Sequence, residues 1–90
     1  MLPLLIFALQ TAPAPAAPDK EPPRFTQCMD LATSDPAKGQ EDAIRWRTEG
    51  GGALARQCLG VAYANGGKWA AAAGAFEDAA REARSEEHTS

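Results

Sequence analysis

The sequence has very few of the residues that catalysis and metal binding require. It contains one histidine, His88, so no pair of imidazoles is available for a catalytic triad or a zinc site. Its two cysteines, Cys28 and Cys58, are thirty residues apart, which is not the close spacing of a metal-binding or redox motif. We therefore predict that the protein is not an enzyme and holds neither a metal nor a cofactor.

A charge excess and a long hydrophobic run are also lacking. Nine Lys and Arg residues against twelve Asp and Glu residues give a net charge of -3, so no basic surplus exists to neutralise phosphate groups. Nucleic acid is therefore not expected as a partner. The apolar run from Leu2 to Leu9 is too short to span a bilayer. Three Phe, two Trp and one Tyr among 90 residues leave room for one small domain at most.

The N-terminal residues follow the order of a secretory signal peptide. The apolar run is followed by small residues and prolines, and Ala14 and Ala16 place small side chains at both specificity positions of a cleavage site. We predict a signal peptide at residues 1–16 and a periplasmic or secreted protein, with no membrane insertion after cleavage. Residues 17–24 are rich in proline, which disfavours helix, and are predicted to form a linker.

One feature of the N-terminus departs from the signal-peptide pattern. No Lys or Arg precedes the apolar run, so the α-amino group supplies the only positive charge there. A start codon assigned too late would explain this. The alternative is an Ala/Pro-rich N-terminus on a cytosolic protein, because such a composition does not pack into a core in either case.

Two short helices are predicted in residues 25–49, which we interpret as a degenerate helical pair. The first follows from the three- and four-residue spacing of apolar residues between Phe25 and Thr33. The second begins with Asp35 as N-cap and Pro36 at the first helical position, and it ends before three consecutive glycines at residues 50–52. Its residues expected to point inward are Ala37, Ala43, Ile44 and Trp46.

The clearest helical patterns lie in the last part of the chain. A third helix is predicted from Ala53 to Ala64, and the Asn-Gly-Gly sequence that follows favours a left-handed C-terminal stop. A fourth helix is predicted from about Lys68 to Ala83. Its apolar residues recur every three or four positions: Trp69, Ala72, Ala73, Phe76, Ala79, Ala80 and Ala83. Together these patterns predict an all-α protein of antiparallel helical hairpins.

The last two predicted helices share a spaced set of small and aromatic residues. In chain order the residues of this set are Leu59, Gly60, Tyr63, Gly67, Trp69, Ala72, Phe76 and Ala79, and their spacing needs no insertion or deletion to match the pattern named next. Residues 53–83 therefore resemble one tetratricopeptide repeat, although Arg56 replaces the family's usual Trp and Arg84 its closing Pro. The resemblance implies a fragment of an α-solenoid. It also implies close helix contact at Gly60 and Ala72, with the three aromatic residues filling the space around it.

The same resemblance implies a function in protein binding. In this family the first helix of each repeat lines a groove that binds other protein segments. The corresponding positions here are Leu54, Gln57, Val61, Ala64 and Asn65. They lack the Lys and Asn clamp that some members use for a C-terminal carboxylate, so we expect mainly apolar contact with a protein or peptide. Two alternatives stay open: a non-catalytic appendage of a longer enzyme or envelope assembly factor, and a structural domain that self-associates.

The two cysteines have two interpretations that the sequence does not separate. After export, Cys28 and Cys58 could form a disulfide between the first and third helices, worth about 3–4 kcal/mol for a loop of this length. Alternatively, both are small buried hydrophobic residues on helix faces. The sequence does not give the distance between their Cα atoms, which decides the matter.

The last seven residues, RSEEHTS, resemble a translated reading frame of a widely used sequencing adapter. We therefore expect residues 84–90 to be a non-native tail and the chain to be a fragment. The alternative is a genuine polar C-terminus. Because about three repeats are normally needed for an independently stable stack, a single clear repeat predicts weak stability.

Overall fold

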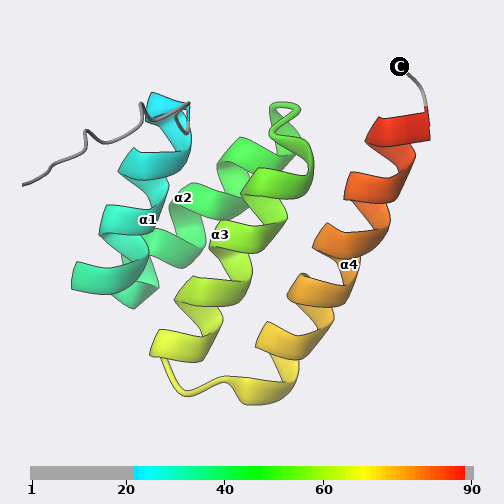
Figure 1. The fold of residues 1–90 in the computed structure, drawn as a ribbon. Coiled ribbons are helices and arrows are strands. Elements are labelled where there is room, and N and C mark those ends of the chain that lie inside the picture. Colours follow the sequence, from blue (N-terminus) through cyan, green and yellow to red (C-terminus); the bar gives the residue numbers. More distant parts are fainter. Residues whose placement is uncertain (1–21, 89–90) are drawn as a thin grey trace, which may run out of the picture.

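The computed structural model describes residues 22–88, which form four helices and no strand (Figure 1). The helices are α1 (Pro23–Ser34), α2 (Pro36–Thr48), α3 (Gly52–Asn65) and α4 (Trp69–His88). The prediction of an all-α protein is confirmed. The predicted signal peptide and residues 17–21 of the predicted linker lie outside the described residues. Within the range that the structure describes, no helix combines the length and apolar character needed to cross a membrane.

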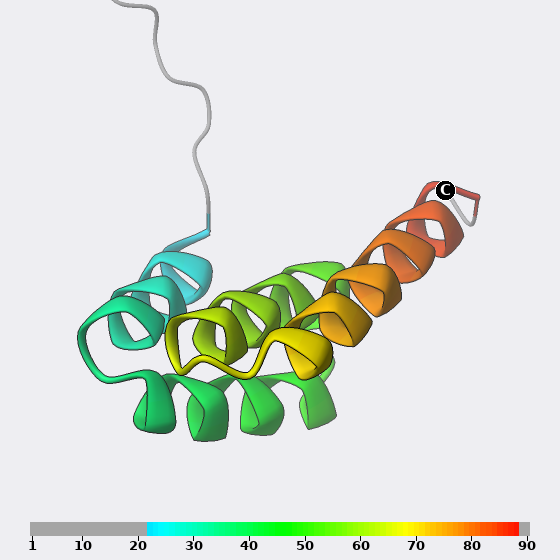
Figure 2. The ribbon, with the colours of Figure 1, turned by 90° about the horizontal axis from the view of Figure 1, so that it is seen from below.

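Consecutive helices run antiparallel, and α3 is the centre of the arrangement (Figure 1). α3 packs against α1, α2 and α4, whereas α4 packs against α3 alone among the described helices. Figure 2 shows α2 beneath α1 and α3, with α4 at the outer edge. The four helices therefore form two hairpins that are joined through α3.

Local signals set two of the helix boundaries as the sequence predicts. At the start of α2, the Asp35 carboxylate accepts a hydrogen bond from the backbone N–H of Lys38 at 3.3 Å, and Pro36 occupies the first helical position. After the end of α3, Gly67 has a φ of +79°, the left-handed conformation expected for this stop. Both predictions are confirmed.

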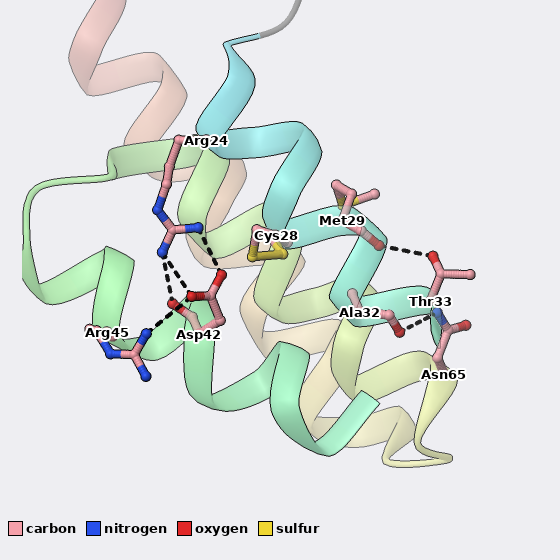
Figure 3. Close-up of a disulfide and its surroundings, with 9 residues drawn as sticks. Arg24, Cys28, Met29, Ala32, Thr33, Asp42, Arg45 and Asn65 are labelled. Carbon is pink, nitrogen blue, oxygen red and sulfur yellow. Dashed lines mark hydrogen bonds and ion pairs between the residues drawn. A yellow bond between two sulfur atoms is a disulfide. The ribbon is translucent and has the colours of Figure 1, made fainter. Parts of the chain in front are cut away.

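The predicted linker is wrong at its C-terminal end, because Pro23 and Arg24 belong to α1. Proline is tolerated in a first helical turn, where its missing N–H would have no partner. The Arg24 guanidinium donates to both carboxylate oxygens of Asp42, at 2.7 and 3.0 Å, and Arg45 donates to the same carboxylate at 3.1 Å (Figure 3). Arg24 also lies 4.9 Å from the ring centre of Trp46. These contacts tie the first turn of α1 to α2.

A disulfide between Cys28 of α1 and Cys58 of α3 lies in the core (Figure 3). The structure therefore agrees with the interpretation of Cys28 and Cys58 as a disulfide-bonded pair. Both side chains are fully buried, and the larger residues buried around them are Phe25 and Leu59. The other buried apolar residues are all alanines: Ala32, Ala43, Ala55, Ala62, Ala72, Ala75 and Ala79. With so little apolar volume in the core, the cross-link carries a large share of the stability.

Two glycines allow neighbouring helices to approach closely. A Cβ atom on Gly39 of α2 would lie 2.5 Å from the Cα atom of Ala32 in α1, closer than real Cβ atoms come. A Cβ atom on Gly60 of α3 would lie 2.5 Å from the ring of Phe76 in α4, and Ala72 of α4 is buried. The prediction of small residues at the α3–α4 contact is confirmed. The sequence had not singled out Gly39.

α4 buries only part of the apolar face predicted for it. Its buried residues are Ala72, Ala75 and Ala79, whereas Trp69 is 70% exposed and Phe76 is 40% exposed. Three further residues of the predicted face are exposed: Ala73, Ala80 and Ala83. The expectation that Trp69 fills the space around the helix contact is therefore wrong. The physical reason is that α4 packs on one helix, which covers a strip narrower than its apolar face.

The inward face predicted for α2 is only partly correct. Ala43 is fully buried, and the partly buried side chains of Ile44 and Trp46 pack against the core. Ala37 is exposed, contrary to the prediction. It lies in the first turn of α2, where Gly39 makes the close contact with α1.

α4 also extends further than predicted, to His88 instead of Ala83. Near its end, a carboxylate oxygen of Glu86 accepts a hydrogen bond from the backbone N–H of Ala53 at 3.0 Å. Ala53 lies in the first turn of α3, where backbone N–H groups have no partner within the helix. The end of α4 thus caps the start of α3.

Replacing both Cys28 and Cys58 with alanine removes the cross-link and should strongly destabilise the chain. We expect the free energy of unfolding to fall by about 3–4 kcal/mol, because the unfolded chain regains the entropy of an open loop. Far-UV circular dichroism during urea titration measures the change against the oxidised wild-type protein. A variant with the wild-type midpoint would contradict the central role given to this disulfide.

Gly39→Ala and Gly74→Ala form a matched pair of helix substitutions. Gly39→Ala should destabilise the protein by about 1–3 kcal/mol, because its methyl group meets the α1 backbone. Gly74→Ala should instead stabilise it by up to about 1 kcal/mol through helix propensity, since an added Cβ there has no atom within 4 Å. Denaturant unfolding of both variants checks this. A stabilising Gly39→Ala would show that α1 and α2 are further apart than described.

Candidate functional site

α3 is covered by neighbouring helices on three sides and open on the fourth. α1, α2 and α4 pack against it, and Figure 2 shows α1 and α4 flanking the side opposite α2. Ala55 and Ala62 lie on the buried side of this helix. The residues away from that side are spaced three, four and three apart along the helix, and we call them the α3 face: Leu54, Gln57, Val61 and Ala64.

The α3 face is apolar apart from one amide. Leu54 and Val61 are partly buried and pack against the core, and Ala64 is also partly buried. Gln57 is exposed. Packing against the core holds Leu54 and Val61 in place while part of each side chain stays accessible. A surface ordered in this way loses little conformational entropy when it binds.

Asn65, the fifth residue predicted for the binding groove, has a different environment. Its side-chain Nδ2 donates a hydrogen bond to the backbone carbonyl of Ala32 at 3.0 Å, as Figure 3 shows. Ala32 lies in the last turn of α1, where carbonyl groups lack a partner within the helix. Asn65 thus ties the end of α3 to the end of α1, and its amide is already engaged.

A groove of about 310 Å³ lies between the start of α3 and the end of α4. We call it the α3–α4 groove, and it is lined by Ala53, Gln57, Phe76, Ala79, Ala80 and Ala83. Gln57 supplies the only polar side chain of this lining. The α4 residues of this groove were not predicted as a surface, because periodicity alone assigns every apolar residue of α4 to the core. The sequence did contain a signal for an exposed surface: the apolar face of α4 is wider than the strip that one neighbouring helix covers.

Five of the exposed apolar residues of α4 follow a regular spacing of four, three, four and three. We call them the α4 stripe: Trp69, Ala73, Phe76, Ala80 and Ala83. Trp69 and Phe76 are the large hydrophobic side chains exposed among the described residues. An exposed Trp beside other apolar side chains is uncommon on a surface that contacts only water.

The other flank of the α3–α4 hairpin is charged. A second depression between the two helices is lined by Arg56, Asp78, Arg81, Glu82 and Ser85. Arg81 forms an ion pair with Asp78 one helical turn away. Charge and apolar surface are therefore separated on the two flanks of one hairpin.

The side chains of these surfaces offer apolar contact and hydrogen bonding. Over residues 22–88, no group of His, Cys, Asp or Glu side chains is arranged to hold a metal ion. Cys28 and Cys58 are both used in the disulfide, so neither presents a thiol. The α3 face and the α3–α4 groove thus offer apolar contact to a polypeptide segment, and the Gln57 amide can orient such a segment by accepting or donating one hydrogen bond.

Protein-family models, curated proteins and solved structures give no match to this chain. The tetratricopeptide resemblance thus rests on the residues and their geometry. The functional interpretation rests on the same basis.

Asn65→Ala and Gln57→Ala separate the structural residue from the surface residue. Asn65→Ala should lower the free energy of unfolding by about 0.5–1.5 kcal/mol, because it removes the hydrogen bond to the Ala32 carbonyl. Gln57→Ala removes an exposed side chain and should change this free energy by less than about 0.5 kcal/mol. Chemical denaturation measures both. Wild-type stability in Asn65→Ala would return that residue to the candidate binding surface.

Proposed function

We propose that this chain is an exported, tetratricopeptide-like module that binds a segment of another protein along the α3 face and has no catalytic activity. The observation that carries the proposal is the position of α3, which is packed on three sides and presents Leu54 and Val61 on its open side. A helix held in this way offers a preformed, partly apolar surface. Such surfaces are common sites of protein–protein contact.

The arrangement of the helices supports the repeat interpretation. α3 and α4 form an antiparallel hairpin in which Gly60 admits the ring of Phe76, and both residues are among the eight that carry the family resemblance. α3 also packs on both helices of the preceding hairpin, α1 and α2. In a helical-repeat stack, each repeat buries its core against its neighbour in the same manner.

The buried disulfide supports the proposal of export. Structural disulfides form and persist in oxidising compartments such as the periplasm, and they are rare in the cytosol. A core made largely of alanine, with Cys28 and Cys58 fully buried, depends on that bond. Together with the signal-like residues 1–16, this favours a protein that folds after export.

The chemistry of the α3 face indicates what the partner presents. Apolar side chains would pack on Leu54 and Val61, and a backbone or side-chain polar group would pair with the amide of Gln57. No lysine or arginine lies on this face, so a partner's carboxylate would find no cation there. We therefore propose an internal, amphipathic segment of another protein and not a free C-terminus.

A photo-crosslinking side chain at residue 57 tests this function in exporting cells. Position 57 is exposed on the α3 face, whereas Lys38 is exposed on α2, which lies on the opposite side of α3. We expect a crosslinked product with a different protein from position 57 and none of the same size from position 38. Products of equal intensity from both positions would count against a specific α3 face.

Substitutions then test whether the captured contact uses this face. Val61→Glu places a negative charge in the apolar contact, and Gln57→Arg places a positive charge at an exposed position without disturbing the packing of the helices. With the crosslinking side chain moved to position 64, both variants should reduce crosslinking at least about tenfold. Ala37→Glu adds the same negative charge as Val61→Glu at an exposed position of α2 and should leave the crosslinking from position 64 unchanged. If Gln57→Arg and Val61→Glu both crosslinked as the wild-type protein does, the assignment would be wrong.

A further inference from the structure

The α4 stripe plays no part in the proposed function, yet it holds the most exposed aromatic side chain of the described residues. We propose that the stripe joins two copies of this chain in an antiparallel homodimer, with Trp69 of each copy seated in the α3–α4 groove of the other. This interface lies beside the surface proposed to capture another protein along Leu54 and Val61, and the two surfaces share Gln57.

The stripe is self-complementary about its midpoint. Phe76 is seven residues from Trp69 and seven residues from Ala83, so along the helix axis each lies about 10 Å from it. Two copies laid antiparallel with their Phe76 residues side by side therefore place Trp69 of one opposite Ala83 of the other. The same contact forms twice, which is the condition for a closed two-fold dimer.

The two ends of the stripe match in size. One end is Trp69, which is 70% exposed, and the other end borders the α3–α4 groove, an open depression of about 310 Å³ that is lined mainly by alanines. An indole ring fits into a groove of this volume. Gln57 in its lining has a carbonyl oxygen that can accept the indole N–H, a donor that buried tryptophans normally satisfy. A large side chain and a small-residue groove thus occur on the same surface of each copy.

The spacing along α4 also suits a partner helix. Residues repeating at four and three positions form the narrow apolar seam by which two helices pack side by side at a small crossing angle. The buried strip of α4, from Ala72 to Ala79, lies to one side of this seam and is already used against α3. The seam is therefore available to a second helix without displacing α3.

Charge favours the antiparallel over the parallel arrangement. α4 has no charged side chain from Trp69 to Phe76, and its acidic residues begin at Glu77 and Asp78. A parallel pair would lay the two acidic halves together. An antiparallel pair lays the charged half of each helix along the uncharged half of its partner, near the partner's positive helix N-terminus. One like-charge contact remains, between the two Glu77 residues beside the two-fold axis.

The area available indicates a weak dimer. A Trp that is 70% exposed and a Phe that is 40% exposed together offer on the order of 200 Å² of aromatic surface per chain. The exposed alanines of the stripe add to this area from both copies, and the total stays in the range of weak, transient interfaces, below about 1,200 Å². We therefore expect dissociation in the micromolar range.

Sedimentation equilibrium of the full chain from about 1 µM to about 1 mM tests this proposal. The mass should rise from monomer to dimer and stop there. Trp69→Ala should weaken association at least about tenfold, because the largest aromatic side chain of the interface is lost from both copies. Glu77→Gln should tighten it, because the like-charge contact at the axis is removed. A monomer throughout this range would overturn the proposal.

A matched pair of substitutions locates the interface on α4. Ala80 and Ala71 are both exposed alanines of this helix, on nearly opposite faces. Ala80→Arg should abolish the dimer, whereas Ala71→Arg should leave it intact, and circular dichroism verifies that both are folded. Equal effects of the two would overturn the assignment to the stripe.

A shortened chain distinguishes a second copy from the apolar N-terminal run as the source of association. If self-association is lost when residues 1–16 are removed from a chain that keeps its helical signal, that run is responsible and the proposed interface is wrong. Retained association with the same response to Trp69→Ala supports it. Crosslinking of another protein from position 64, which does not line the α3–α4 groove, would be unaffected by Ala80→Arg if only the dimer interface is lost.

Discussion

Because Cys28 and Cys58 are joined, α1 and α3 cannot separate while the bond is intact, and the remaining packing follows from that constraint. The side chains around the bond are mostly alanines, which bury little apolar surface individually. Their contribution depends on helices that approach closely, as Gly39 allows between α1 and α2. The disulfide and the small residues therefore stabilise the fold in different ways. The disulfide restricts the conformations of the unfolded chain, and the small residues let the helices of the folded chain pack closely.

α3 connects this constraint to the surfaces proposed for binding. One side of the helix carries Cys58, another contacts α4 through Gly60, and the side between α1 and α4 presents Leu54 and Val61. The proposed binding surface thus lies on the helix that packs against the other three described helices, and this packing keeps its side chains ordered before a partner binds. The α4 stripe is placed differently, because α4 has a single neighbour.

Much of the fold could be predicted because it depends on neighbours in sequence. The Asp35 cap and the stop at Gly67 each require only a few adjacent residues, whereas the close contact at Gly60 was implied by the family resemblance. What was missed depends on tertiary placement. Periodicity shows that α4 has an apolar face, but it does not show which half is covered, so Trp69 was assigned to the core. The disulfide stayed open for the same reason, since the 6.3 Å between its Cα atoms follows from how α1 and α3 pack.

The contacts of α4 imply that the four helices do not open with equal ease. α1 and α3 are covalently joined, α1 and α2 share the Arg24–Asp42 ion pair, and α4 is held by α3 alone among the described helices. A local opening of α4 would therefore break one helix–helix interface and leave the packing of the other three helices intact. Trp69 and Phe76, the large hydrophobic side chains exposed among the described residues, thus lie on the helix with a single described neighbour, and any contact that covers them also raises the free energy of a local opening of α4.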